Sequence, residues 1–184
     1  MNEELAFYLA QGISVFTGIL AILTMQLKNM RTILFLQVVI NLMASTNYLL
    51  LGGDSGAFIS LLAIIQSIVM YLYNKNDKKP QWWLTVLFVA GYWGISAYNI
   101  VSSNEIMGIL PAIAAFCFCM ALVQEKAWIF RVWGALNPAF WVPYDFVTRS
   151  YVMFFVHLGI FISSVVAMVR LDGFFGLIKK KEKR

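Results

Sequence analysis

The sequence predicts an all-α membrane protein with seven transmembrane helices, arranged as two parallel three-helix repeats joined by a linker helix (3+1+3). Three observations predict this class. The 184 residues are 61% hydrophobic and only 12% charged, which leaves too little polar surface for a soluble domain. Seven apolar segments are long enough to cross a bilayer. The first three of these segments also resemble the last three at a constant offset.

The segment 82–101 organises the chain because nothing else in the sequence resembles it. It is twenty residues without a charge, and at 1.5 Å per residue a helix of this length crosses the hydrocarbon core. It is the fourth of the seven segments, with three on either side. A single crossing between two groups of three returns the chain to its starting side, so both groups enter the membrane from the same side. Duplicated groups are then parallel repeats about an axis along the membrane normal.

The other six segments are divided by short polar links. A basic link at 28–31, a glycine-rich turn at 52–56 and a polar loop at 74–80 separate the early segments, and the acidic N-terminus lacks the basic region of a signal peptide. We expect a first repeat in 1–76, a linker helix in 77–104, a second repeat in 105–172 and a basic tail in 173–184. The expected helices are 5–25, 32–51, 57–73, 106–123, 128–147 and 151–169.

The positions of Lys and Arg predict the orientation. With the N-terminus outside, thirteen of the fourteen Lys and Arg residues fall on the inner side and only Arg149 falls outside. Basic residues concentrate on the cytoplasmic side of a membrane, so the C-terminus is expected in the cytoplasm. The charge of +5 thus follows membrane sidedness, and no nucleic-acid partner is indicated. The basic tail is expected to contact anionic lipid of the bilayer.

Shifting the chain by 96 residues aligns the two groups without gaps. Asn41 then meets Asn137, and Tyr48 meets Tyr144. In both halves the asparagine and the tyrosine are seven residues apart, which is two turns along one helical face. Apolar matches are frequent by chance in such a composition, whereas these two pairs indicate an internal duplication.

Polar residues near the middle of the spans are the first candidates for a binding site. Polar groups at this depth are costly unless they face protein or water. One interpretation is hydrogen bonding between helices, worth about 0.6 kcal/mol per bond. The other is a binding site, which we favour for the two asparagines because the duplication places both at one level. The candidates are Asn41, Gln66, Ser67, Asn137 and Ser163.

Aromatic residues extend the candidate site. Trp133, Asn137 and Trp141 follow one another at four-residue spacing and therefore share a helical face, which Tyr144 continues. In the first half, Gln37 precedes Asn41 on the equivalent face. Aromatic rings beside an amide suit a flat or ring-shaped polar ligand, although packing between helices is the alternative. We expect Tyr48 and Tyr144 to close the site toward the outside.

Three titratable residues lie toward the outer ends of the last two spans. His157 is interpreted as a hydrogen-bonded packing residue, with proton coupling as the alternative. Asp145 and Arg149, four residues apart, form either an interfacial ion pair or an extracellular gate. No catalytic motif is present, and no metal or cofactor is expected. Cys117 and Cys119 project to different sides of one helix, which argues against a shared metal or a disulfide.

Short segments of the chain resemble a known family. Gln11-Gly12, the segment 48–52 and the segment 137–144 resemble the bacterial YgjV-type inner-membrane proteins, and the 3+1+3 pattern resembles the wider SWEET and PQ-loop (MtN3-like) transporter superfamily. The resemblance implies a bacterial inner-membrane location and passive movement of a small polar solute, such as a sugar or a vitamin-like compound, by alternating access. A receptor that binds in the same cavity without transport is the alternative, and a homo-oligomer is compatible with either.

The chain also departs from the SWEET pattern. SWEET proteins carry hinge prolines in both repeats, whereas this chain has Pro111, Pro138 and Pro143 in the second half only. Their pocket asparagines lie on the third and seventh helices, where this chain carries 66–67 (Gln-Ser) and 163–164 (Ser-Ser). The resemblance therefore carries over no sugar specificity.

The orientation gives a direct prediction. A reporter fused after Arg184 should report a cytoplasmic location, and one inserted at Gly53 should report an external one, because this arrangement keeps the basic residues on one side. Alkaline phosphatase and green fluorescent protein fusions at both sites measure this. A cytoplasmic signal at Gly53 would contradict the seven-span topology.

Overall fold

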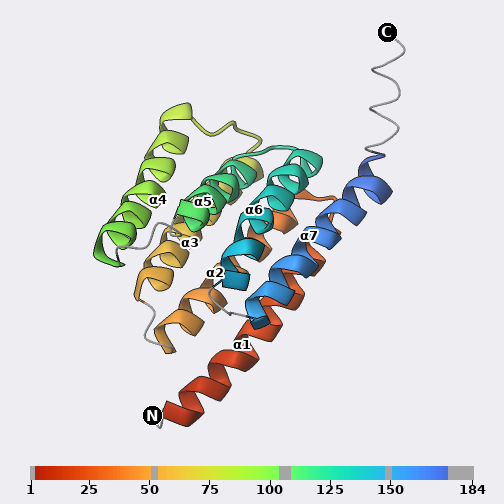
Figure 1. The fold of residues 1–184 in the computed structure, drawn as a ribbon. Coiled ribbons are helices and arrows are strands. Elements are labelled where there is room, and N and C mark those ends of the chain that lie inside the picture. Colours follow the sequence, from red (N-terminus) through yellow and green to blue (C-terminus); the bar gives the residue numbers. More distant parts are fainter. Residues whose placement is uncertain (1–2, 51–53, 104–108, 148–150, 174–184) are drawn as a thin grey trace.

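The computed structural model describes residues 3–50, 54–103, 109–147 and 151–173 (Figure 1). These residues form seven helices and no strand, so the predicted class, an all-α membrane protein with seven helices, is confirmed. The predicted boundaries agree with the observed ones within three residues. The helices are α1 (Glu3–Thr24), α2 (Met30–Leu50), α3 (Asp54–Lys75), α4 (Trp82–Ser103), α5 (Ile109–Leu122), α6 (Ala127–Val147) and α7 (Tyr151–Asp172). The division into residues 1–76, 77–104, 105–172 and 173–184 stays a prediction.

Four of these helices are long and apolar enough to cross a membrane by length and composition: α1, α2, α3 and α7. The apolar segment Ala112–Leu122 of α5 is shorter. The sequence of α4 carries no charge but is rich in Trp and Tyr, and α6 carries charged residues and two prolines. Such residues lower the hydropathy of a helix that still packs within a bundle, since an aromatic ring with a polar edge is suited to the membrane interface.

One end of the bundle collects the positive charge, and we call it the basic end. Helices α1, α3, α5 and α7 end there, and α2, α4 and α6 begin there. Two exposed ion pairs lie there: Arg31, at the start of α2, pairs with Asp77 at 2.6 Å, and Lys79 pairs with Glu125 at 3.4 Å. All Lys and Arg residues in the described part of the chain lie in its links or in the first or last turns of its helices: Lys28, Arg31, Lys75, Lys78, Lys79, Lys126, Arg131 and Arg170.

Side chains cap the helices at the basic end. Asn29 precedes α2, and its Oδ1 accepts a hydrogen bond from the backbone N–H of Arg31 at 2.9 Å, as an N-cap residue does. At the end of α3 the backbone turns through Asp77, which has a φ of 53°. The N–H of Asp77 bonds to Asn74 O and that of Lys78 bonds to Tyr73 O. This is a Schellman-type stop, and it positions Asp77 to meet Arg31.

The helices pack in a closed order. Helix α1 packs against α2 and α7, α3 packs against α2 and α5, and α6 packs against α5 and α7. This pattern is unchanged when α1, α2 and α3 are exchanged for α5, α6 and α7, which is the exchange expected for two parallel repeats. Helix α4 packs only at the edge, against α3 and α5, on the opposite side of the bundle from α1 and α7 (Figure 1).

The main cluster of buried apolar residues extends from the middle of the bundle to the basic end. It joins the end of α1 to the start of α2, the later turns of α3 and α5, the first half of α4 and the first turn of α6. Its largest members include Ile33, Leu34, Tyr92, Leu122 and Phe130. On α7, the buried residues among the described side chains are Ser163, Ser164 and Ala167, all in the half nearer the basic end. The large buried side chains are therefore gathered toward this end, while the buried residues described in the other half are small or polar.

Helices α1 and α7 run side by side and approach closely at two glycines (Figure 1). A Cβ atom added at Gly18 would lie 2.9 Å from Cγ2 of Val156, and one added at Gly159 would lie 2.8 Å from Cδ1 of Ile22. Small residues let membrane helices pack backbone to backbone. Gly18 and Gly159 therefore set the distance between α1 and α7.

Gly18→Leu should push α1 away from α7, because the β-branched Val156 has little freedom to move aside. We expect the free energy of unfolding to fall by about 1–3 kcal/mol, as for other overpacked contacts. Thermal unfolding in detergent, followed by circular dichroism, measures the change. Gly12→Leu on the same helix is the matched control, since a Cβ atom at Gly12 has no neighbour within 4 Å. Equal effects of the two substitutions would contradict close packing at Gly18.

Candidate functional site

The asparagine of the first half lies buried between α2 and α3. Nδ2 of Asn41 donates to the backbone oxygen of Gln37 at 2.7 Å and to Oγ of Ser67 at 3.5 Å. Ser67 itself donates to Ala63 O at 2.7 Å. Gln37, one turn before Asn41, is also buried. Asn41, Gln37 and Ser67 thus form one polar group inside the first half.

The asparagine of the second half faces α5. Nδ2 of Asn137 donates to the backbone oxygen of Ala114 at 2.7 Å. Trp133, one turn earlier, packs edge-on against Phe116 of α5 with ring centroids 6.1 Å apart. Asn137 is only partly buried, and no hydrogen bond within the described residues uses its Oδ1.

Trp141 faces α7 instead. Its ring stacks on His157 with centroids 5.4 Å apart and planes 11° from parallel, and the ring of Tyr144 meets its edge at 5.7 Å. All three side chains are half-buried and lie in the half of the bundle away from the basic end. They form an aromatic group, which we call the Trp141 group.

Gln66 and Ser163 each join the two halves. Nε2 of Gln66 donates to the backbone oxygen of Cys119 at 3.2 Å and to its sulfur at 3.1 Å, which connects α3 to α5. Oγ of Ser163 donates to Ile22 O at 2.8 Å, which connects α7 to α1. Both residues are buried at their helix contacts.

The structure therefore brings the predicted residues together in separate groups. Asn41 joins Gln37 and Ser67, Trp133 and Asn137 share contacts with α5, and Trp141 joins His157 and Tyr144. Within the described residues, no hydrogen bond or ring contact joins Asn41 to Asn137. Tyr48 is half-buried on α2. Arg149 lies outside the described residues, and so does the side chain of Asp145, so the predicted pair between them stays a prediction.

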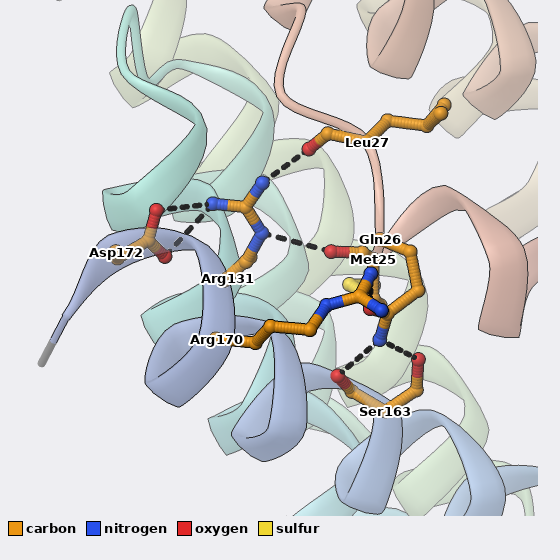
Figure 2. Close-up of polar contacts among 7 residues, drawn as sticks. All are labelled: Met25, Gln26, Leu27, Arg131, Ser163, Arg170 and Asp172. Carbon is orange, nitrogen blue, oxygen red and sulfur yellow. Dashed lines mark hydrogen bonds and ion pairs between the residues drawn. The ribbon is translucent and has the colours of Figure 1, made fainter.

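A second polar group, at the basic end, contains a buried charge (Figure 2). The guanidinium of Arg131, on α6, is 1% exposed. Its Nε donates to Met25 O at 2.8 Å, one terminal nitrogen donates to Leu27 O, and the other pairs with both carboxylate oxygens of Asp172 at 2.7 and 2.8 Å. A buried guanidinium requires such compensation by a carboxylate and by hydrogen bonds.

Arg131 thereby binds the end of α1 to the end of α7. The carbonyl groups of Met25 and Leu27 lie just beyond α1, where the last helical carbonyl groups lack partners and the helix dipole is negative. A cation at this position donates hydrogen bonds to these carbonyl groups and is attracted by the negative end of the helix dipole. The paired carboxylate of Asp172, 14% exposed, comes from the last residue of α7.

Gln26 adds a second connection between α1 and α7. Its Nε2 donates to both the backbone oxygen and Oγ of Ser163 at 2.8 Å, and its Oε1 accepts a hydrogen bond from Arg170 at 3.0 Å (Figure 2). We call this whole group the α1 lock. Its members are Met25, Gln26, Leu27, Arg131, Ser163, Arg170 and Asp172.

The sequence reasoning assigned Arg131 only to the basic inner side and did not identify the lock. A signal was available, because Arg131 lies inside an apolar helix and Asp172 ends the last one. Ionisable residues within membrane segments usually pair with one another. The partner carbonyl groups, by contrast, carry no mark in a sequence.

Seven packed helices, with polar groups at mid-depth and a buried ion pair at one end, define a polytopic helical membrane protein. The sequence pattern of one family covers residues 8–173. The chain belongs to this family, the Imp-YgjV bacterial inner membrane proteins. No curated protein and no solved structure matches the chain.

The two partners of the buried ion pair should respond differently to substitution. Asp172→Asn leaves a buried cation without a counter-charge and should lower the free energy of unfolding by about 3–5 kcal/mol. Arg131→Gln should cost less, because Asp172 is partly exposed and its carboxylate can turn toward water. Thermal unfolding of both variants and of the double variant measures the coupling between them.

The exposed pair of Arg31 and Asp77 is the control for this prediction. It has a similar distance, 2.6 Å, but its side chains are 47% and 85% exposed. Arg31→Gln should change stability by at most about 1 kcal/mol. A larger effect of Arg31→Gln than of Asp172→Asn would show that burial does not determine the cost.

Proposed function

We propose that this protein is a facilitator for a small polar solute that works by alternating access, as the resemblance to SWEET-like transporters implies. The N-terminus lies outside and the basic end faces the cytoplasm, because Lys and Arg concentrate on that side of a membrane. In this orientation the basic end, with its large buried side chains, is the side closed in this conformation. No catalytic step belongs to this proposal.

The closure of one end is the observation that carries the proposal. The large buried side chains and the α1 lock lie toward the basic end, whereas the buried side chains described in the other half are small or polar, such as Ala10, Ser45 and Ala57. A carrier needs a tight seal on one side while the other side admits solute. A uniformly packed bundle would not support this function.

The half away from the basic end offers groups that suit a polar ring. Asn137 is only partly buried, and one turn further along the half-buried rings of Trp141 and His157 stack on each other. Aromatic faces bind the CH faces of sugars and stack on heterocycles, while an amide fixes orientation. The favoured solutes are therefore sugar-like or vitamin-like compounds.

A receptor that binds without transport is the second candidate. The observation that favours it is the use of Asn41 and Gln66, whose amide groups bond to neighbouring helices. Residues held in this way stabilise one conformation. A receptor would bind the solute and remain closed at the basic end.

Reconstituted vesicles test the two candidates. The purified protein is screened by thermal shift against sugars, nucleosides and vitamins, because a bound ligand raises the unfolding temperature. Each stabilising compound is then tested for counterflow in proteoliposomes. Counterflow supports a facilitator, stabilisation without counterflow supports a receptor, and no response to any compound contradicts both.

Asn137→Leu should leave the fold nearly intact and remove binding of the compound found in the screen. The expected loss is about 1–3 kcal/mol of binding free energy, since the solute loses a buried partner. Thermal shift and counterflow measure it. Thr46→Leu is the matched control, because Thr46 is exposed on α2 and should tolerate leucine with unchanged binding. If Asn137→Leu unfolds the protein while the folded remainder still binds, the asparagine is structural.

A further inference from the structure

The two halves of the bundle meet along two seams. Helices α1 and α7 form one seam, and α3 and α5 form the other. Exchanging α1, α2 and α3 for α5, α6 and α7 turns one seam into the other. Their surroundings differ, however, and the difference bears on how the bundle could open.

The α3–α5 seam is bridged. Helix α4 packs against both α3 and α5, and its Tyr92 is buried in the same apolar cluster as Cys119 of α5. Beneath α4, Gln66 of α3 bonds to the backbone and the sulfur of Cys119. A helix that packs on both sides of a seam resists its separation, because parting would expose apolar surface on three helices.

The α1–α7 seam lacks such a helix in the described part of the chain. At the basic end it is closed by the α1 lock. The bonds of Gln26 with Ser163 and Arg170, and those of Arg131 with Met25 and Leu27, run between the first and the second half. The ion pair of Arg131 and Asp172 lies within the second half. When these hydrogen bonds across the seam part, their donors and acceptors can bond to water instead. Further along, the seam is closed by the contacts at Gly18 and Gly159.

We propose that the bundle opens at its basic end by parting the α1–α7 seam, with α3, α4 and α5 acting as the hinge. This inference rests on the proposed function, because it specifies which seam moves during alternating access. The bonds of the α1 lock that cross the seam must break in the open state, while the bonds between Gln66 and Cys119 persist. The movement is a hinge rotation of one half relative to the other.

Distances between spin labels test the inference without any solute. One pair of labels, at Lys28 and Val169, reports on the α1–α7 seam, and a second pair, at Asn76 and Lys126, reports on the α3–α5 seam. All four positions are exposed. The labels are attached to a ketone-bearing amino acid so that cysteines remain free for a later step, and Cys117→Ala and Cys119→Ser remove the native thiols.

Arg131→Gln should add a longer distance to the Lys28–Val169 pair and leave the Asn76–Lys126 pair unchanged. Gln26→Leu, which keeps the ion pair, is the second variant if Arg131→Gln does not fold. Equal lengthening of both pairs, lengthening of the Asn76–Lys126 pair alone, or no change in a folded variant would each overturn the inference. Arg31→Gln is the control that removes a charge at the same end outside the lock.

A disulfide across the seam provides the reverse test. A Cβ atom at Gly18 lies 3.6 Å from Cβ of Val156, within the range of a disulfide. In the double variant Gly18→Cys and Val156→Cys, added to the lock variant, oxidation should remove the longer distance and reduction should restore it. A longer distance that persists with the disulfide formed would place the opening elsewhere.

These outcomes are separable from those of the transport assay. A seam that parts in a protein without counterflow would support this inference and contradict the facilitator. Counterflow that continues with the Gly18–Val156 disulfide formed would support the facilitator and contradict this inference.

Discussion

The buried charge of Arg131 is the constraint on which the basic end depends. Removing a guanidinium from water costs several kcal/mol even after the protein relaxes, so its partners must be held in place. Those partners come from the end of α1 and the end of α7. Arg131 therefore fixes the relative positions of three helices, and its hydrogen bonds can form only when all three ends meet.

Helix α6 connects this constraint to the candidate binding residues. Arg131 and Asn137 are six residues apart on it, about 9 Å along the axis at 1.5 Å per residue. Trp141 lies one further turn away and stacks on α7, the same helix that supplies Asp172. A shift of α6 relative to α7 would therefore be felt both at the Trp141 group and at the lock. This is a physical route by which an occupied site could influence the basic end.

Much of the fold follows from the sequence because it depends on composition and length. Uninterrupted apolar segments such as 82–101 must form helices in a membrane, where every backbone group needs an internal partner, and so their boundaries were predictable to within three residues. The candidate site was harder to predict from the sequence. Helical spacing places Trp133, Asn137 and Trp141 on one face, but the neighbour that each contacts depends on how α5 and α7 pack beside α6. The α1 lock could not be predicted for a similar reason, since Arg131 bonds to backbone carbonyl groups 104 and 106 residues away.

The lock also has a consequence for the making of the protein. It joins the first helix, the sixth and the final residue of the seventh, so a ribosome must have synthesised nearly the whole chain before it can form. Until then the end of α1 lacks its cap and the guanidinium of Arg131 lacks its carboxylate partner. The last turn of α7 is therefore needed before the buried charge of Arg131 has its carboxylate partner.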